Sequence, residues 1–465
     1  MLHRIFSTLA IATFSVGSLF AQTEPKAWTA ADVQQILKQR IDVDKQCVGI
    51  AVGIIDAKGN QVVGYGSLRA VKAPVKPDRD TVFEIGSVTK VFTTLLLADM
   101  VERGEVTLSD PASKYLPKTV TLPTRSDREI TLLDLATHTS ALPSMPDNFS
   151  PKDSLNPYAD YTVEQMYAAL SNCKLKRDIG KKYEYSNLGM GLLGHILALR
   201  AGVDYEQLVA DRITKPLGMK DTSIALNADM SKRLAFGHDD TLGEVKNWDL
   251  PTFAGAGALR STPADMIKFI EANMGKTESP LLDPMTMQVE TRSPTGVPNL
   301  SIALGWHKLK SKNGEIVWHN GQTGGYHSFI GFDKKRNVGV VVLANTAADI
   351  DDVGLHVLDR EIPLRKIVPK KERTAIKVDP KILESYVGAY ELVPTFVIAI
   401  TKEGDHLMLQ ATGQPKFEIF AESEKEFFLK AVDAQISFVK DGESKVIQLI
   451  LHQGGADQTA KKLSN

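Results

Sequence analysis

The chain has 465 residues, which favours two domains over one, and its 43% hydrophobic and 24% charged residues are close to the average of soluble globular proteins. Lysine and arginine (55 residues) nearly balance aspartate and glutamate (56), and the formal net charge of -1 gives no long-range attraction for nucleic acid or for an anionic membrane. The composition therefore argues against a nucleic-acid partner and against a multi-span membrane protein, and it indicates no particular oligomeric state.

The first residues have the pattern of an export signal. His3 and Arg4 precede an apolar run from Ile5 to Phe20, and the small residue Ala21 follows where a signal peptidase can cut. Serine, threonine and glycine interrupt this run, which is also shorter than the ~20 apolar residues that span a bilayer. We therefore expect a signal peptide over residues 1–21, export to the periplasm or out of the cell, and no stable membrane anchor.

Residues 22–362 are predicted to form one α+β domain. Strands near both ends of this region flank a helical middle, which predicts a sheet that joins the N-terminal and C-terminal parts. In chain order the predicted elements are a helix over 31–41, strands over 48–56 and 61–68 joined by a turn at 58–60, a helix over 88–103 that ends at Gly104, a mostly helical stretch over 108–276, strands over 303–309, 315–319, 328–333 and 338–344, and a helix over 349–358.

Residues 363–380 are rich in lysine and proline and lack a periodic apolar face, so they are predicted to be a linker. Its basic run, Lys366–Arg373, is interpreted as a solvated segment rather than a binding patch. Short alternating apolar runs then predict a meandering antiparallel sheet over 381–465, closed into a small β-barrel without a visible catalytic set. These runs cover 396–400, 406–409, 417–420, 426–429, 436–439 and 446–451.

A serine followed three residues later by a lysine places a hydroxyl and an amine about one helical turn apart, where an unprotonated lysine can accept the serine proton. The pattern occurs at Ser87–Lys90, Ser171–Lys174 and Ser437–Lys440, about as often as chance gives. Positions i and i+3 of a strand face opposite sides, which excludes Ser437 in its predicted strand. Ser171 lies at a polar helix end that is typical of a solvated surface.

Ser87 begins a strongly apolar helix directly after Phe83-Glu-Ile-Gly86. The free backbone N–H groups and the dipole at a helix N-terminus suit a developing oxyanion, although a serine there is also a common helix cap. Lys90 lies one turn into the same apolar helix, where burial of an ammonium is costly unless the group is paired or has lost its proton. Lys90 therefore needs either a partner or a function.

Two further patterns add polar groups. Tyr185-Ser-Asn187 follows a polar segment, and a tyrosine beside a lysine can act as general base toward serine and then as general acid toward the leaving group, while the asparagine holds a substrate amide. His319-Asn-Gly321 ends a predicted strand and precedes Gln322; the glycine lets substrate backbone approach, and the cationic or polar side chain beside it can meet a carboxylate. Taken alone, the tyrosine segment is typical of a polar loop and the histidine of a structural residue.

Other patterns do not indicate a cofactor or a metal. Gly189-Met-Gly-Leu-Leu-Gly194 matches a dinucleotide-binding fingerprint by letter, but a polar segment precedes it instead of a buried strand, so we interpret it as a site of tight helix packing. The two cysteines, Cys47 and Cys173, form no disulfide framework, and no His-Glu-x-x-His run or clustered cysteine pair predicts a metal site.

Together, Ser87-Val-Thr-Lys90, Tyr185-Ser-Asn187 and His319-Asn-Gly321 resemble the serine β-lactamase and penicillin-binding protein superfamily, in its class C β-lactamase-like branch of D-aminopeptidases and esterases. The resemblance implies an antiparallel sheet flanked by helices plus a mostly helical lobe, and the C-terminal region resembles a lipocalin-like barrel. Further segments that share the resemblance are Leu108–Pro117, Leu135–Ser140, Pro216–Met219, Ala258–Thr262 with Asp265-Met266, and Gly339–Asn345.

The resemblance implies a role for each of these residues. Ser87 is the expected nucleophile that becomes acylated, Lys90 and Tyr185 are the expected proton-transfer pair, and Asn187 is the expected ligand of a substrate amide. The backbone N–H groups of Ser87 and Gln322 are expected to form the oxyanion hole.

Two positions depart from the pattern of the family. His319 stands where the lactamases usually have lysine, so a permanent cation for an antibiotic carboxylate is lost, and the case for a dedicated β-lactamase is weaker. Ala141 stands where relatives often have glycine after His-Thr-Ser.

The sequence thus predicts an exported serine hydrolase that forms an acyl-enzyme on Ser87 and needs no cofactor. A peptidase acting on peptides that contain D-amino acids, a β-lactamase and a carboxyl esterase share this machinery, and we favour the first two. The alternative from another class is a catalytically silent scaffold that binds peptides or peptidoglycan. An inactive copy has no physical reason to retain a buried amine, which argues against the scaffold.

Overall fold

The computed structural model describes residues 27–69, 75–290, 293–367, 373–393, 396–412, 416–430, 434–453 and 456–463. The predicted signal peptide at 1–21 lies outside these residues. None of the helices within the described ranges is long and apolar enough to cross a bilayer. The chain divides into two compact units, Met1–Val368 and Pro369–Asn465, which are described separately below.

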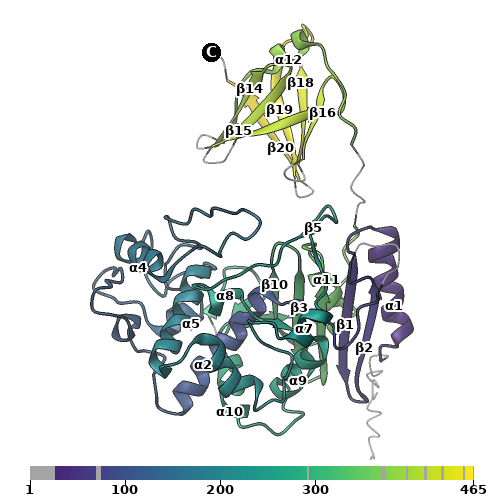
Figure 1. The fold of residues 1–465 in the computed structure, drawn as a ribbon. Coiled ribbons are helices and arrows are strands. Elements are labelled where there is room, and N and C mark those ends of the chain that lie inside the picture. The colour runs from purple at the N-terminus through teal and green to yellow at the C-terminus, as the bar shows by residue number, and fades with distance from the viewer. Residues whose placement is uncertain are drawn as a thin grey trace, which may run out of the picture. The chain divides into compact units, whose positions relative to one another are not determined.

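The first unit is built on an antiparallel sheet of eight strands (Figure 1). Its two halves come from opposite ends of the unit, since β1 pairs with β12 along six residue pairs from Ile50↔Ala344 to Ile55↔Gly339. In spatial order the strands are β2 (Gly59–Gly66), β1 (Gly49–Asp56), β12 (Val338–Ala344), β11 (His327–Asp333), β10 (Glu315–Gln322), β9 (His307–Lys310), β8 (Leu300–Ile302) and β7 (Ser293–Pro294). The prediction of one sheet from both parts of the chain is confirmed.

Helices cover both faces of this sheet. Strand β1 is buried on both sides: Ile50 and Val52 pack with the helices α1 and α11, whereas Ala51 and Ile55 belong to a large core that includes residues of α2, α5 and α9. The helices are α1 (Ala30–Lys38), α2 (Thr89–Glu102), α3 (Leu132–Ala136), α4 (Val163–Asn172), α5 (Asn187–Ala201), α6 (Tyr205–Val209), α7 (Ala228–Arg233), α8 (Ala254–Gly257), α9 (Pro263–Asn273), α10 (Leu282–Glu290) and α11 (Asp351–Leu358).

Short elements complete the first unit. Two small two-stranded sheets pair β3 (Phe83–Glu84) with β6 (Arg260–Ser261) and β4 (Gly237–His238) with β5 (Glu244–Val245). Single helical turns lie at η1 (Gln39–Val43), η2 (Gly86–Val88), η3 (Ala112–Tyr115) and η4 (Ala210–Thr214).

One predicted strand of this unit is wrong. Residues 303–309 were expected to be a single strand, but β8 ends at Ile302 and β9 begins at His307. Between them Gly305 takes a φ of +73°, and its N–H donates to the carbonyl of Ala136 at 3.0 Å. A Cβ at Gly305 would lie 2.6 Å from Thr94 Oγ1, so the chain turns here against α2.

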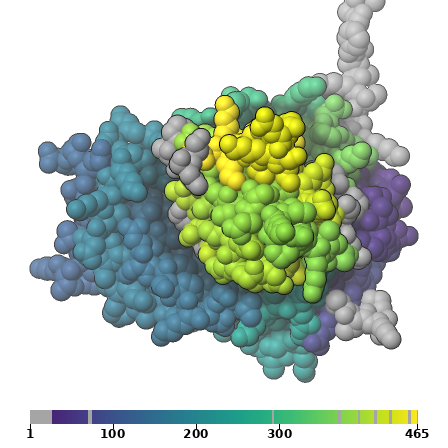
Figure 2. Space-filling model, turned by 90° about the horizontal axis from the view of Figure 1, so that it is seen from above, coloured from purple at the N-terminus to yellow at the C-terminus, as the bar shows by residue number. Residues whose placement is uncertain are grey.

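The second unit is a closed antiparallel barrel of eight strands preceded by the short helix α12 (Pro380–Tyr386). The prediction of a small antiparallel β-barrel is confirmed, whereas α12 and the strands β13 and β20 were not predicted. Its strands are β13 (Gly388–Val393), β14 (Phe396–Glu403), β15 (His406–Ala411), β16 (Lys416–Ala421), β17 (Glu426–Leu429), β18 (Ala434–Lys440), β19 (Val446–Gln453) and β20 (Ala456–Lys462). Aromatic and aliphatic side chains, among them Tyr386, Tyr390 and Phe438, fill its own core. The barrel residues, green to yellow in Figure 2, form a rounded surface.

Candidate active site

Ser87 lies on a sharp turn between a strand and a buried helix. Strand β3 ends at Glu84, the turn η2 contains Ser87, and α2 begins at Thr89. Gly86 takes a φ of +48°, and a Cβ at this position would lie 2.8 Å from the backbone nitrogen of Gln322, so only glycine fits without a shift of the backbone. The turn therefore presents a half-buried serine hydroxyl at the start of α2, close to strand β10.

Lys90 lies one turn further along α2 and is 0% exposed. Its Nζ donates hydrogen bonds to Ser87 Oγ at 2.8 Å and to the carbonyl oxygen of Ala256 in α8 at 2.7 Å. None of the described acidic side chains forms an ion pair with this amine, and burial lowers the pKa of Lys90 well below its ordinary value. An unprotonated amine in contact with a serine hydroxyl is a suitable proton acceptor.

Tyr185 lies on the other side of the amine, just before α5. The Lys90 Nζ is 4.8 Å from the centroid of the Tyr185 ring, and the Ser87 side chain lies close enough to the phenol to lower its pKa. Burial raises the pKa of Tyr185, and the nearby Ser87 side chain opposes this change. The next residue, Ser186, caps α5 by accepting from Gly189 N at 2.9 Å, and the half-buried Asn187 is the first residue of that helix.

Strand β10 approaches the turn η2, which contains Ser87, closely. A Cβ at Gly321 would lie 2.1 Å from the carbonyl oxygen of Ile85 and 2.8 Å from the backbone nitrogen of Ser87. The neighbouring strand β11 adds a hydrogen bond from Ser328 Oγ to the same Ile85 oxygen at 2.8 Å. Together with the contact between Gly86 and Gln322, this places the backbone of Ser87 beside that of Gln322.

His319, two residues before Gly321, is buried and does not provide a permanent cation. Its side chain is 1% exposed, and Nδ1 lies 2.5 Å from the carbonyl oxygen of Asn320. Burial is the main cause that lowers the pKa of His319 well below its usual value, and the nearby His307 and Lys90 lower it further. His319 is therefore neutral at physiological pH.

His138 also belongs to this site, although the sequence analysis assigned it no role. It precedes Thr-Ser-Ala141, is 1% exposed and has a φ of +56°, and Ala141 follows with a φ of +64°. The His138 ring stacks on the Tyr185 ring with centroids 4.6 Å apart. The resemblance of Leu135-Ala-Thr-His-Thr-Ser140 to the family, noted from the sequence, was the one signal that pointed to this segment.

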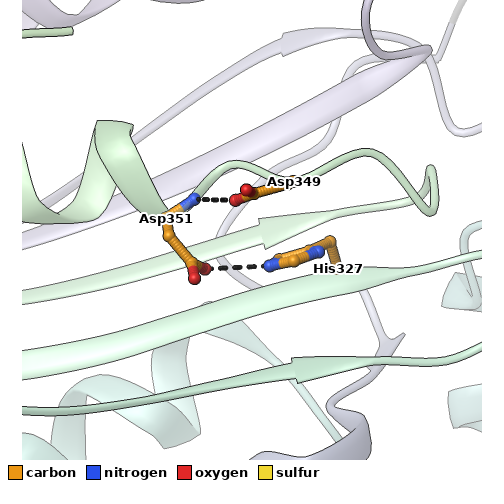
Figure 3. Close-up of side chains that lie close together, drawn as sticks. All are labelled: His327, Asp349 and Asp351. Carbon is orange, nitrogen blue, oxygen red and sulfur yellow. Dashed lines mark hydrogen bonds and ion pairs between the residues drawn. The ribbon is translucent and has the colours of Figure 1, made fainter. Parts of the chain in front are cut away.

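A polar network lies next to β10 (Figure 3). Asp351, the first residue of α11, accepts hydrogen bonds from Asn320 Nδ2 at 2.6 Å and lies 2.9 Å from His327 Nε2. Asp349 accepts from the backbone N–H of Asp351 at 2.9 Å and from Arg365 at 2.8 Å. His327, Asp349 and Asp351 have potential metal-ligand atoms within 4.8 Å of one another, but protein donors occupy these carboxylates.

The other two serine–lysine pairs lie in other elements of the chain. Ser171 lies in α4, where its Oγ accepts from the backbone N–H of Thr121 at 3.2 Å. Ser437 lies in strand β18 of the barrel, so the prediction that it is in a strand is confirmed.

Comparison with known proteins assigns the family. The family model described as "Beta-lactamase" matches residues 30–360, which is well over half of the chain. The chain belongs to the Beta-lactamase family. Residues 372–462, which contain the barrel, match a second model described as "Domain of unknown function (DUF3471)". The class of fold and the resemblance predicted from the sequence are both confirmed.

The chain is similar to bacterial proteins that are named as a peptidase, a β-lactamase and a penicillin-binding protein. The D-alanyl-D-alanine-carboxypeptidase/endopeptidase AmpH of Escherichia coli is 32% identical over 342 residues, covering 69% of this chain and 85% of its own length. A β-lactamase of Pseudomonas fluorescens is 28% identical, covering 68% and 94%. A penicillin-binding protein of Bacillus subtilis is 25% identical over 443 residues, covering 88% of this chain and 94% of its own.

Solved structures agree with the fold. The β-lactamase/D-alanine carboxypeptidase from Yersinia pestis superposes with a TM-score of 0.61 at 26% identity, covering 73% of this chain and 100% of its own. A class C β-lactamase from Rhodobacter sphaeroides, at 24% identity and the same TM-score, covers 72% and 99% and supports the fold alone. This member of the Beta-lactamase family is therefore a serine hydrolase.

Proposed function

We propose that this protein is an exported acyl hydrolase that forms an acyl-enzyme on Ser87, with peptides that contain D-amino acids or β-lactams as substrates. The observation that best supports this function is the state of Lys90. Its amine is completely buried, has a lowered pKa and donates a hydrogen bond to Ser87 Oγ at 2.8 Å. A fold has no structural need for such an amine, whereas proton transfer from serine requires one.

The proposed reaction begins when Ser87 Oγ attacks the carbonyl carbon of the amide or lactam. The hydroxyl proton passes to Lys90 Nζ, and the backbone N–H groups of Ser87 and Gln322 stabilise the resulting oxyanion. The bond to the leaving nitrogen then breaks as Tyr185 delivers a proton to it and receives one from the Lys90 ammonium. Water attacks the serine ester in the second half, which releases the acid and restores Ser87. Asn187 is proposed to hold a substrate amide.

The opposite pKa shifts of Lys90 and Tyr185 indicate which of the two residues accepts the serine proton. Burial lowers the pKa of Lys90 and raises that of Tyr185, so the amine is unprotonated and the phenol protonated over the same range of pH. Lys90 is therefore proposed as the base that accepts the serine proton. Tyr185 acts as a neutral relay between the amine and the leaving group.

Within this reaction class, we favour a peptidase over a dedicated β-lactamase. His319 is proposed to contact the substrate carboxylate, but a neutral imidazole binds it by hydrogen bonding rather than as a permanent charge. The related D-alanyl-D-alanine-carboxypeptidase/endopeptidase adds support for peptides. A carboxyl esterase is the second candidate, because an ester substrate without a carboxylate needs no cation at position 319.

The remaining parts of the chain are assigned as proposals. Residues 1–21 are proposed as an export signal, 22–362 as the hydrolase domain, 363–380 as a linker and 381–465 as a lipocalin-like barrel domain. Nucleic acid is not an expected partner, because the net charge of the chain is -1.

Mass spectrometry after incubation with a penicillin or a fluorophosphonate tests the proposal. We expect one adduct, on Ser87, in the wild-type protein and none in Ser87→Ala. The absence of an adduct with every acylating probe would favour the catalytically silent scaffold. Turnover of a chromogenic cephalosporin, D-amino-acid amides and short esters then ranks the substrate classes.

The barrel contains an internal control for this experiment. Ser437 Oγ lies 2.9 Å from His452 Nε2, and His452 Nδ1 lies 2.6 Å from Asp457, the same order of contacts as in a serine–histidine–aspartate triad. Ser437 is in the middle of a strand that pairs on both sides, and backbone N–H groups in such a ladder lie in the plane of the sheet. The backbone of the described strands β17, β18 and β19 therefore offers no oxyanion hole to Ser437, so we expect no stable adduct on this residue.

A further inference from the structure

His138 holds the Tyr185 segment by three different contacts. The backbone N–H of Glu184 donates to the carbonyl oxygen of His138 at 2.8 Å, and the backbone N–H of Ser186 donates to His138 Nδ1 at 3.1 Å. These two bonds flank Tyr185 on either side in the sequence. Between them the imidazole stacks on the Tyr185 ring, with centroids 4.6 Å apart and an angle of 29° between the planes.

The backbone of His138 is in a conformation that most side chains avoid. Its φ is +56°, in the left-handed region, where a residue other than glycine persists only when its surroundings hold it. The surroundings do so here, because the side chain is 1% exposed and the backbone N–H donates to the carbonyl oxygen of Leu135 at 3.3 Å. The strained residue is thus itself fixed, which makes it a rigid support for the segment that it contacts.

The protonation state of His138 is determined by its neighbours. Nδ1 accepts the Ser186 N–H, so it carries no proton, and the neutral tautomer has its proton on Nε2. Burial is the main cause that lowers the pKa of His138, followed by the nearby Lys90 of α2 and His307 of β9. Charging this imidazole would place a cation against the amine of Lys90 and break the bond to Ser186.

We propose that His138 is a positioning residue for the reaction, acting by fixing the Tyr185 phenol against Ser87 and Lys90. This inference rests on the proposed function of Ser87. His138 touches neither the serine nor, in the proposed scheme, the substrate, and it transfers no proton. Its contribution is to hold the phenol in one orientation, because small displacements of a proton-transfer group slow the reaction strongly.

His138→Asn is the appropriate variant. Asparagine tolerates the left-handed backbone region better than most residues, so this change keeps the fold of the loop while it removes the stacked ring. We expect kcat per active site to fall about 10- to 100-fold, with little change in KM, because the phenol is less well oriented but substrate contacts remain. Active sites are counted by fluorophosphonate labelling of Ser87, so partial unfolding does not imitate a loss of kcat.

A double-mutant cycle with Tyr185→Phe separates positioning from a general structural role. If His138 acts through the Tyr185 hydroxyl, His138→Asn should have almost no further effect on kcat in the Tyr185→Phe background. An equal loss in both backgrounds would overturn the inference. So would a wild-type value of kcat per labelled site in His138→Asn alone.

His195→Gln is a matched control. His195 lies in α5 with its Nε2 2.6 Å from the hydroxyl of Tyr167 in α4, so it also contacts a tyrosine but takes no part in the proposed chemistry. We expect unchanged kcat per labelled site in this variant. If wild-type Ser87 itself is not labelled, the proposed function fails; if it is labelled and only the His138 cycle is additive, the present inference fails alone.

A measurement on the wild-type protein covers the case in which His138→Asn does not fold. The ¹⁵N chemical shifts of the His138 ring should show an unprotonated Nδ1 and a protonated Nε2 at neutral pH. A protonated Nδ1 would be incompatible with the bond from Ser186 and would overturn the inference.

Discussion

Burial of Lys90 lowers the stability of the fold and, at the same time, supplies the proposed reaction with an unprotonated amine. The amine is 0% exposed and has hydrogen-bond partners but no ion-pair partner among the described residues. In the unfolded chain a lysine is protonated up to a pH of about 10.4. The unfolded state therefore binds a proton at Lys90 that the folded state does not bind. For this reason the free energy of unfolding falls as the pH drops below the unfolded pKa of lysine.

Lys90→Met should remove this dependence. The folded pKa of Lys90 is lower than its unfolded pKa, so between these two values wild-type stability decreases with falling pH by up to about 1.4 kcal/mol per pH unit. We expect the free energy of unfolding of Lys90→Met to exceed that of the wild type by a margin that widens from pH 10 toward pH 7, while acylation of Ser87 is abolished.

Denaturant titrations of both proteins at several pH values measure this margin. Lys152→Met, which replaces an exposed loop lysine, is the control and should leave the pH dependence unchanged. A margin that is constant with pH would show that Lys90 is protonated in the folded protein.

The contacts around Lys90 and Tyr185 can be predicted from the sequence to different extents. Ser87 and Lys90 are one helical turn apart, so their contact follows from local spacing and from the apolar residues of their helix. The carbonyl of Ala256 and the ring of His138 come from segments far away in the chain. Their contacts depend on tertiary packing, and the sequence around Ala256 or His138 contains no pattern that predicts it.

At the level of elements, the proposed oxyanion hole requires that β10 and the turn η2 lie close together. Gly321→Ala would place a Cβ 2.1 Å from the carbonyl oxygen of Ile85 and 2.8 Å from Ser87 N, so strand and turn must move apart. We expect the acylation rate to fall about 10²- to 10³-fold, the usual cost of a lost oxyanion donor. Stopped-flow acylation by a chromogenic cephalosporin measures this rate.

Gly442→Ala in the barrel is the control, because a Cβ there meets no atom within 4 Å. It should leave acylation unchanged. Wild-type acylation in Gly321→Ala would mean that the close approach of β10 is not needed for the reaction.

The network next to β10 ties this strand to the start of α11. The Asp351 carboxylate contacts His327 and accepts from Asn320. In Asp351→Asn an amide NH₂ group replaces one carboxylate oxygen, so a donor then faces the N–H of His327 or of Asn320. We expect a loss of about 1–3 kcal/mol in the free energy of unfolding. Denaturant titration measures this loss.

Metal removal is a separate test of the same network. Dialysis of the wild-type protein against EDTA should change neither its free energy of unfolding nor its turnover. A loss of either would reveal a cation held by His327, Asp349 and Asp351.

Two segments differ from the prediction because their local sequence pattern is misleading. Strand β20 (Ala456–Lys462) is mostly polar, and among its side chains from 457 to 462, whose burial is described, Ala460 alone belongs to the barrel core, so no apolar alternation signals the strand. In residues 303–309, by contrast, an apolar run predicted one strand, but the structure has a turn at Gly305 between β8 and β9. Pairing partners, rather than local pattern, decide both segments.

At the scale of the whole molecule, the two units have hydrophobic cores made of different residues. The barrel core is formed by residues of α12 and the eight strands, whereas the cores of the first unit are formed by residues that precede position 365. The change from a lysine- and proline-rich segment to alternating runs made this division predictable from sequence. Two units with separate cores are expected to unfold in separate transitions.

Phe438→Ala should therefore destabilise the barrel alone. The side chain of Phe438 is 2% exposed, and its ring stacks on the Tyr386 ring with centroids 4.0 Å apart. The centroids of the Phe427 and Tyr390 rings lie 5.4 and 5.9 Å from that of Phe438. Removing this ring leaves a cavity between aromatic side chains, and we expect the barrel transition to lose about 3–5 kcal/mol in calorimetry. Labelling of Ser87 and the transition of the first unit should stay at wild-type values. A parallel shift of both transitions would show that the hydrolase unit depends on the barrel for its stability.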